Sequence, residues 1–307
     1  MIRACCIGRN NVDIFLNNNM VYPGGNCNNV AADLAKEGHS VSLITNVGND
    51  MLGKLQLDAV KKLGVNCSGS NVVDDQTAWC MIRHENGDRL FVKSDTSIDK
   101  RHPISLKDIE KIDSSCYDVI YTCSDSIFTL SEELFVALKQ KGIPVCCDFS
   151  ARWQAEHVEY LCKYVDCVYL SCEKYTLEET EALLTRFCKA GCSIAVGTRG
   201  TYGSVAYDGK TMHRQCAYNF KIKDTLGAGD AFLSSFTAHY IQGKKELTLW
   251  CKELPDSQQK NQLKDDYDSV LIDYSLQSAA IFAAKTCMEY GGFGNGIKFE
   301  KMMIGEG

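Results

Sequence analysis

Short apolar strands alternate with amphipathic helices along most of this chain, and this alternation limits the folds that it can adopt. Strand patterns cover residues 3–8, 41–47, 118–123, 144–149, 167–170 and 194–198. Helical patterns cover residues 28–37, 52–63 and 130–141, and a further helix opens at Thr176 with Glu179 completing a capping box. Strands that alternate with helices form a largely parallel sheet with helices on both faces. The sequence therefore predicts an α/β fold with three layers.

Some segments leave this alternation. Residues 77–83 and 89–93 have strand patterns, and the Glu-Asn-Gly-Asp between them at 85–88 predicts a hairpin. A hairpin inserted between helices predicts an excursion from the main sheet, such as a flap or lid. Residues 242–268 are polar and rich in Lys, Glu and Gln, so we expect a surface excursion there before a final helix over 274–290.

Composition excludes several classes of partner. The net charge of −6, without a long basic run, argues against nucleic acid or an anionic membrane as partner. The least charged stretch, 231–243, is too short to span a bilayer, and no signal peptide pattern is visible. The 17 cysteines lack any Cys-x-x-Cys pair and mostly lie in apolar strand patterns. We therefore expect reduced thiols and a cytoplasmic protein.

The most informative motif is Asp-Thr-Leu-Gly-Ala-Gly-Asp at 224–230, followed by an uncharged run over 231–241. The run predicts a buried helix, and the unpaired N–H groups at its start suit an anion such as phosphate. Asp230 would lie in the first turn, where its carboxylate can act as base for a hydroxyl that attacks the phosphate. A glycine-rich helix start, with an Asp favoured by the helix dipole, is the structural alternative. No Gly-Lys-Ser/Thr follows, so the motif is not a Walker A loop.

A second motif, Gly-Gly-Asn-Cys-Asn-Asn-Val-Ala, occupies residues 24–31. Paired glycines before a helix let a small polar ligand approach the backbone, and the amide of Asn29 can donate to and accept from hydroxyls. Alone, this motif fits a simple turn followed by a helix cap slightly better.

In this order, the two motifs resemble those of the PfkB (ribokinase-like) carbohydrate kinases, and the resemblance covers about residues 3–293. It implies one ribokinase-like domain over 1–307, a three-layer sandwich with a mostly parallel central sheet. It also implies a small β-lid built from about 11–23 and 72–94. Four further segments are similar to the fructoselysine 6-kinase branch of this family: 8–13, 87–91, 148–153 and 283–286.

The resemblance implies an ATP-dependent sugar kinase that transfers the γ-phosphoryl group to a terminal hydroxyl. The similarity to the fructoselysine 6-kinase branch implies that this hydroxyl is O6 of fructoselysine or of a related fructosamine. The implied catalytic residues are the base and its anion hole: Asp230, Gly229, Ala228 and Gly227. The implied sugar-binding residues are Asp13, Asn10, Gly25, Asn29 and Arg89. The implied nucleotide-binding residues are Thr198, Gly200, Gly203, Asp224 and Thr225.

One segment departs from the family pattern. The family usually has Asn-x-x-Glu after the strand that corresponds to 167–170, and this sequence has Ser171-Cys172-Glu173-Lys174. We expect Mg²⁺ as cofactor with Glu173 beside it, and a monovalent cation is a further candidate. A homodimer through the lid is another expectation.

Two alternatives remain open. The acceptor can be that of another family member, such as fructose, ribose, a keto-deoxy sugar acid or a nucleoside. The altered segment at 171–174 also fits a sugar or nucleotide sensor that has lost catalysis.

Overall fold

An eight-stranded sheet forms the middle layer of the protein. The structure is a computed structural model that describes residues 1–85, 88–124, 130–218, 220, 222–253 and 257–305. In spatial order its strands are β14 (Met212–Gln215), β13 (Ser204–Tyr207), β12 (Ile194–Thr198), β11 (Cys167–Ser171), β10 (Val145–Asp148), β9 (Val119–Cys123), β1 (Arg3–Ile7) and β4 (Ser40–Ile44). The six strands from β12 to β4 are parallel, and the β13–β14 hairpin is antiparallel. The central strands are mostly apolar because both faces of the sheet are covered.

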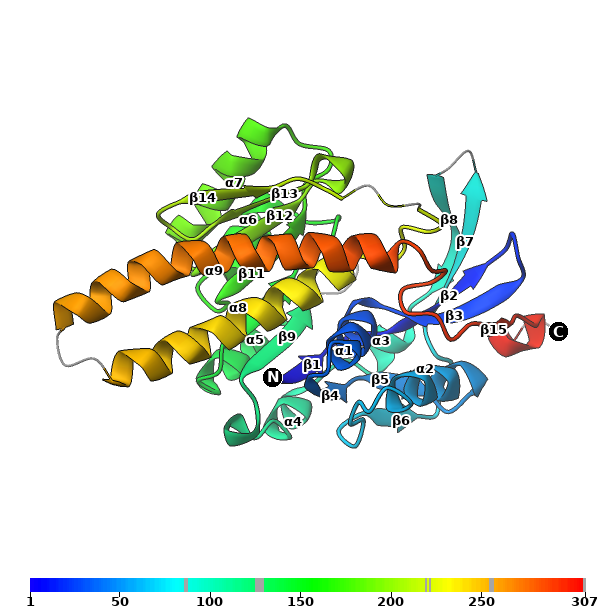
Figure 1. Ribbon diagram of the computed structural model, residues 1–307. Helices are drawn as coiled ribbons and strands as arrows, with labels where there is room; N and C mark the ends of the chain where they lie inside the picture. Colours follow the sequence, from blue (N-terminus) through cyan, green and yellow to red (C-terminus); the bar gives the residue numbers. More distant parts are fainter. Residues whose placement is uncertain (86–87, 125–129, 219, 221, 254–256, 306–307) are drawn as a thin grey trace.

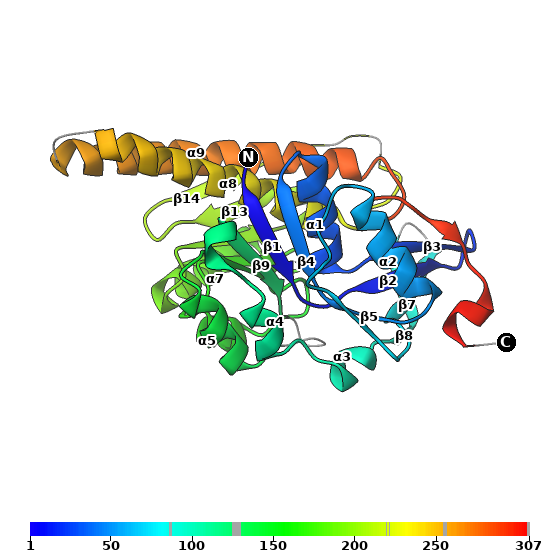
Figure 2. The ribbon, with the colours of Figure 1, turned by 90° about the horizontal axis from the view of Figure 1, so that it is seen from below.

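Helices cover both faces of this sheet (Figures 1 and 2). One face carries α1 (Asn26–Lys36), α8 (Ala228–Glu253) and α9 (Ser257–Thr286), with α2 (Met51–Lys61) beside α1. The other carries α4 (Leu106–Glu110), α5 (Glu132–Gln140) and α7 (Leu177–Ala190), and α6 (Ala155–Leu161) packs against α7. The remaining short helices are α3 (Ile98–Arg101), η1 (Ser114–Cys116), η2 (Gly200–Tyr202) and η3 (Lys301–Ile304). The predicted three-layer α/β fold is confirmed.

A second sheet, the lid, lies beside the main one (Figure 1). Its strands, in spatial order, are β15 (Ile297–Lys298), β3 (Met20–Gly24), β2 (Asn11–Phe15), β7 (Trp79–Glu85) and β8 (Asp88–Asp95). The hairpin β7–β8 was expected, whereas β15, from near the C-terminus, was not. The strand β6 (Asn71–Val73) pairs with β5 (Asn46–Gly48) in a separate small sheet, so this part of the lid begins at Trp79 and not near residue 72.

The two faces of the lid have different surroundings. On the outer face, Val12, Ile14 and Trp79 pack with Leu52 of α2 and with Phe299 near the C-terminus. On the inner face, Phe15, Tyr22 and Ile82 pack with Leu226, which belongs to the 224–230 motif. The inner face of the lid therefore points toward the predicted phosphate-binding helix.

The prediction of a surface excursion over 242–268 is wrong. These residues extend α8 to Glu253 and form the first turns of α9, so the two long helices lie side by side (Figure 1). Buried Leu247 and Leu271 lie among polar residues, and Lys244 Nζ binds Asp268 Oδ2 at 2.9 Å across the pair. Two helices that cover each other need only a narrow apolar stripe, and the high polar content therefore hid the helical pattern.

Three element boundaries also differ from the prediction. The strand expected over 41–47 is two strands, β4 and β5, because the chain leaves the main sheet at buried Thr45. The first helix begins at Asn26, two residues earlier than expected, and the final one ends at Thr286.

All 17 cysteines are free thiols, and 12 of them are buried, where they act as small apolar side chains. Among the helices of the described residues, none combines the length and apolar character that a bilayer crossing requires.

Candidate active site

The carboxylate of Asp230 lies in the first turn of α8 and is held by two amides from α1. Asn29 Nδ2 donates to its Oδ2 at 2.7 Å, and Asn26 Nδ2 donates to its Oδ1 at 3.3 Å. Hydrogen bonds that donate to a carboxylate favour its ionised form, which is the form that accepts a proton. The structure therefore brings the two predicted motifs, 24–31 and 224–230, into direct contact.

Asn26 and Asp148 belong to this site and were not assigned a role from the sequence. Asn26 Nδ2 also donates to Asp148 Oδ2 at 2.8 Å, so one amide joins the carboxylates of Asp148 and Asp230. Asp148 is buried at the carboxyl end of β10 and accepts a second bond from Ser150 N at 2.7 Å. The position of Asp148 at the end of a predicted strand could have indicated this role, because polar residues at the carboxyl ends of parallel strands gather at one edge of the sheet.

The residues expected to bind sugar hydroxyls lie where β1 leads into the lid. Asn10 is 2% exposed, and neither its Nδ2 nor its Oδ1 has a hydrogen-bond partner among the described residues. Buried amides are normally satisfied, so this one is available to a ligand. Asp13 is buried on β2 and accepts from Asn11 Nδ2 at 2.9 Å.

Gly25 allows these elements to approach one another. Its φ is +89°, and a Cβ there would lie 2.7 Å from Asn11 N and 2.8 Å from Asn10 Cα. Only glycine combines this backbone conformation with this close approach. Gly25 is also the N-cap of α1, so it sets the direction in which Asn26 and Asn29 leave the loop.

The loop before α8 is held by Asp224, which is buried. Its Oδ1 accepts from Leu226 N and its Oδ2 from Gly291 N, each at 3.0 Å. Thr225 O accepts from Ala228 N at 3.2 Å, whereas Gly229 is exposed at the start of the helix. Gly227 has φ +77°, and a Cβ there would lie 2.6 Å from Gly292 Cα. The helix start therefore presents backbone to solvent beside Asp230.

The predicted nucleotide loop follows β12. Thr198 ends this strand, Gly200 opens η2 with φ +55°, and Gly203 has φ +91°. Arg199 N donates to Gly203 O at 2.8 Å, which closes the loop into a tight turn. A Cβ on Gly200 would lie 2.6 Å from Glu173 Oε1, so the carboxylate of Glu173 lies against this loop.

The described residues contain no group of three or more His, Cys, Asp or Glu side chains that could hold a metal ion. Mg²⁺ commonly keeps several waters and is held by one or two carboxylates together with the phosphates of a substrate. A lone carboxylate such as Glu173 fits that mode of binding and does not fit an all-protein metal cage.

The carboxylates of the site affect a tyrosine beneath it. Burial raises the pKa of Tyr121 well above its ordinary value, and the negative charges of Asp148 and Asp230 raise it further. The phenol of Tyr121 on β9 therefore stays neutral under the two carboxylates.

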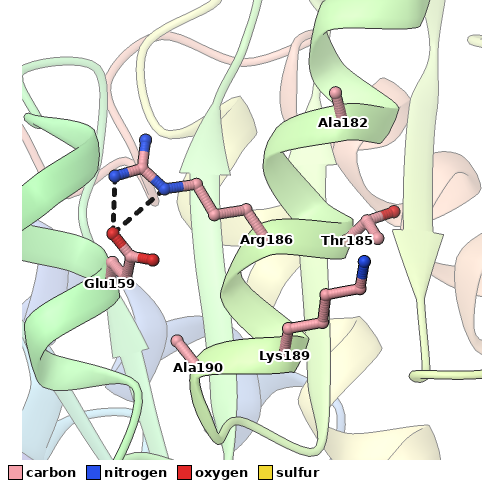
Figure 3. A pocket seen from close by; sticks show the side chains of 6 residues that line it. All are labelled: Glu159, Ala182, Thr185, Arg186, Lys189 and Ala190. Atoms are coloured by element: carbon pink, nitrogen blue, oxygen red, sulfur yellow. Dashed lines mark hydrogen bonds and ion pairs between the residues drawn. The ribbon is translucent and has the colours of Figure 1, made fainter.

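Arg89 lies on β8, and its side chain is outside the part of the chain that the structure describes. The structure also contains a shallow groove between α6 and α7 (Figure 3), which is lined by Glu159, Ala182, Thr185, Arg186, Lys189 and Ala190. There Arg186 Nε donates to Glu159 Oε2 at 3.0 Å. This guanidinium is already paired, and no residue of the Asp230 site lines the groove.

The fold and site define an α/β enzyme with a helix N-terminus and a carboxylate under a lid, and solved structures share this fold. The fructokinase with bound ATP from Xylella fastidiosa superposes with a TM-score of 0.73 at 19% identity, covering 99% of this chain and 98% of that one.

Residues 9–248 match the sequence profile of the pfkB family of carbohydrate kinases, and the chain belongs to this family. It is 29% identical to the fructosamine kinase FrlD of Bacillus subtilis (strain 168) over 300 residues, covering 97% of this chain and 95% of that protein. It is 28% identical to the fructoselysine 6-kinase of Escherichia coli (strain K12) over 240 residues, covering 77% and 88%. The chain is therefore a carbohydrate kinase, a phosphotransferase to alcohol groups.

Proposed function

We propose that this protein is an ATP-dependent kinase that phosphorylates the terminal hydroxyl, O6, of fructoselysine or a related fructosamine. The observation that carries the proposal is the carboxylate of Asp230, held by Asn26 and Asn29 at the N-terminus of α8. The choice of acceptor is supported by the similarity to a fructosamine kinase and a fructoselysine 6-kinase, and by the segments at 8–13 and 148–153.

The sugar would lie between the lid and the carboxyl edge of the main sheet. Asp13 would accept hydrogen bonds from its hydroxyls, and the unpartnered amide of Asn10 would both donate and accept. The terminal hydroxyl would then lie near Asp230. Asp230 takes the hydroxyl proton while the oxygen bonds to the γ-phosphorus and the bond to ADP breaks.

The backbone at the start of α8 would stabilise the charge that develops on the transferred group. Gly229 is exposed there, and the helix dipole favours negative charge at this end. The loop over 198–203 would hold the nucleotide, and Glu173 would hold water of the metal shell. Mg²⁺, when bound with the nucleotide, shields the negative charge of the phosphates.

Substrate choice is tested by measuring ATP consumption with a panel of acceptors. Fructoselysine and another fructosamine should give the highest kcat/KM, above fructose, ribose, a keto-deoxy sugar acid and a nucleoside. A clear preference for one of the latter four would overturn the proposed acceptor while leaving the kinase intact. Saturable stabilisation by a sugar with no turnover of any acceptor would instead indicate the sensor.

The role of Asp230 is tested with Asp230→Asn, which keeps the side-chain shape and removes the base. We expect kcat to fall by about 10²–10⁴-fold, the usual contribution of a positioned acid or base, while ATP still raises the melting temperature. Asp74→Asn, at an exposed position, is the matched control and should leave kcat unchanged. Near-normal turnover by Asp230→Asn would refute the assignment.

A further inference from the structure

Two guanidinium groups lie at the sugar side of the site without an ion-pair partner among the described residues. Arg9 is half-buried between β1 and β2, and its Nη1 is fully buried without a hydrogen-bond partner among the described residues. Arg152 follows the carboxyl end of β10, four residues after Asp148, and forms no ion pair with a described acidic residue. The buried Nη1 of Arg9 is costly without an acceptor, so its partner is expected from outside the chain, whereas Arg152 is exposed to solvent.

Arg152 meets the inner face of the lid. The guanidinium carbon of Arg152 lies 5.5 Å from the ring centre of Phe91, which pairs across the lid with Ile82 of the inner face. A cation above an aromatic ring is held in place by the ring's quadrupole. Arg152 is therefore held against the lid, with its N–H edge available to a ligand.

The thiol of Cys80 locates the two charges relative to the sugar site. Cys80 lies opposite Asp13 in the lid and packs on the inner-face cluster. Burial raises its pKa to about 12, Asp13 raises it too, and the positive charges of Arg9 and Arg152 act in the opposite direction. Cys80 therefore feels both guanidinium charges from its position opposite Asp13, one of the proposed sugar ligands.

We propose that Arg9 and Arg152 form an anion subsite beside the acceptor sugar, which selects sugar conjugates that carry a carboxylate. The proposal rests on the proposed function and makes its acceptor more specific. Guanidinium binds a planar carboxylate through two parallel N–H···O bonds, which a neutral sugar cannot offer. Asp13 and Asn10 would bind the sugar hydroxyls, and the two arginines would bind the carboxylate of the amino-acid part of a fructosamine.

The test compares two acceptors that differ in one charge: fructosylglycine, with a free carboxylate, and fructosylglycinamide, with a neutral amide. The native protein should prefer the carboxylate acceptor by about tenfold or more in kcat/KM, since one charged hydrogen-bonded pair is worth about this factor. Arg9→Gln and Arg152→Gln should each reduce this preference several-fold by raising KM for fructosylglycine, with little change for the amide.

Arg83→Gln is the matched control. It also removes one positive charge, at the position on β7 next to Ile82. Because side chains alternate along a strand, Arg83 points away from the inner face that Ile82 occupies. This variant should keep the full preference for the carboxylate. A native protein that treats both acceptors alike, or an Arg9→Gln variant that loses both equally, would overturn the subsite.

The same comparison can be made by ligand-induced shifts in melting temperature, which do not require turnover. A larger shift with the carboxylate than with the amide would support the subsite even if neither acceptor is phosphorylated. The absence of phosphorylation would refute the proposed function and leave the subsite standing. Equal shifts from the two ligands would refute the subsite. Inhibition by free inorganic phosphate that exceeds inhibition by free glycine and is lost in Arg9→Gln and Arg152→Gln would indicate a phosphate subsite and overturn the choice of carboxylate.

Discussion

Two glycines with similar backbone conformations show how differently single residues act in this protein. Gly25 and Gly38 flank the same helix, α1, with φ of +89° and +85°. A Cβ on Gly25 would meet the backbone of Asn10 and Asn11, whereas one on Gly38 would meet nothing within 4 Å. The first glycine is needed for close approach, and the second only for its backbone conformation.

We predict that Gly25→Ala raises the sugar KM by tenfold or more, because the backbone that carries Asn10 must shift. Gly38→Ala should cost about 1 kcal/mol of stability, the strain of a left-handed residue, and leave KM unchanged. Steady-state kinetics together with denaturant unfolding separate the two effects. Equal KM values in the two variants would contradict this interpretation of Gly25.

At this scale the sequence identified some residues of the site and missed others for a physical reason. Asp230 and Asn29 belong to a recognisable glycine-rich motif, and the structure joins them at 2.7 Å. The bridge from Asn26 to Asp148 depends on β10 and α1 meeting in space, 122 residues apart in sequence. The unpaired state of Arg9 likewise depends on its burial, which no local pattern contains.

Helix α7 is an element that the sequence predicted correctly, including its start. Thr176 Oγ1 accepts from Glu179 N at 3.1 Å, and Glu179 Oε2 accepts from Thr176 N at 2.8 Å. All the atoms of this cap lie within four residues, so the local pattern is sufficient to predict it. The long helices α8 and α9 stabilise each other, and their extent was therefore not visible locally.

We predict that Thr176→Ala lowers the free energy of unfolding by about 1 kcal/mol without changing kcat or KM, because the cap lies outside the site. Thr185→Ala, within the same helix, removes a hydroxyl that bonds to Glu181 O and should change stability by less than half as much. Urea unfolding of both variants is the measurement. A larger loss from Thr185→Ala would contradict the role of the cap.

A second element-scale prediction concerns the segment that covers the outer face of the lid. Phe299 is 6% exposed in a cluster with Val12, Ile14 and Trp79. Phe299→Ala should cost about 3–5 kcal/mol locally, the usual effect of truncating a buried Phe. A looser lid should then admit water and raise sugar-independent ATP hydrolysis, which is expected to be low in the native protein.

Met302→Ala is the control for this variant, because Met302 is 68% exposed in the neighbouring 3₁₀ helix. Melting temperature and ATP hydrolysis without sugar are measured for both proteins. If Phe299→Ala is destabilised but its background hydrolysis stays at the native level, the segment supports the lid without controlling its closure.

For the whole molecule, one buried carboxyl should make stability depend on pH. Asp33 on α1 is fully buried, and within the described part of the chain neither of its oxygens has a hydrogen-bond partner. Burial raises its pKa well above the ordinary value, and the 4.0 Å contact with Lys36 Nζ opposes this only in part. Below about pH 4 the carboxyl is protonated in both states, and above it only the unfolded chain ionises. Stability should therefore fall as pH rises through this range.

We predict that Asp33→Asn is more stable than the native protein at pH 7.5 and that the difference disappears near pH 4. Each unit by which folding raises the pKa costs about 1.4 kcal/mol at a pH above both values, and the variant avoids this cost. Asp58→Asn, on the neighbouring helix, should show no such trend. A stability difference that is the same at both pH values would refute this account of Asp33.

The last strand of the lid has a consequence for how the chain reaches its active form. Asn19 Nδ2 donates to Phe299 O at 3.2 Å across 280 residues, and Gly292 packs against both Asn29 and Gly227. Contacts between such distant residues carry a large loop-closure entropy and form late in folding. During synthesis, strand β3 of the lid therefore lacks its partner β15 until residues near 300 have left the ribosome. Catalytic competence is thus acquired at the end of synthesis, and a nascent chain that stops before residue 290 should hold neither a closed lid nor an ordered sugar site.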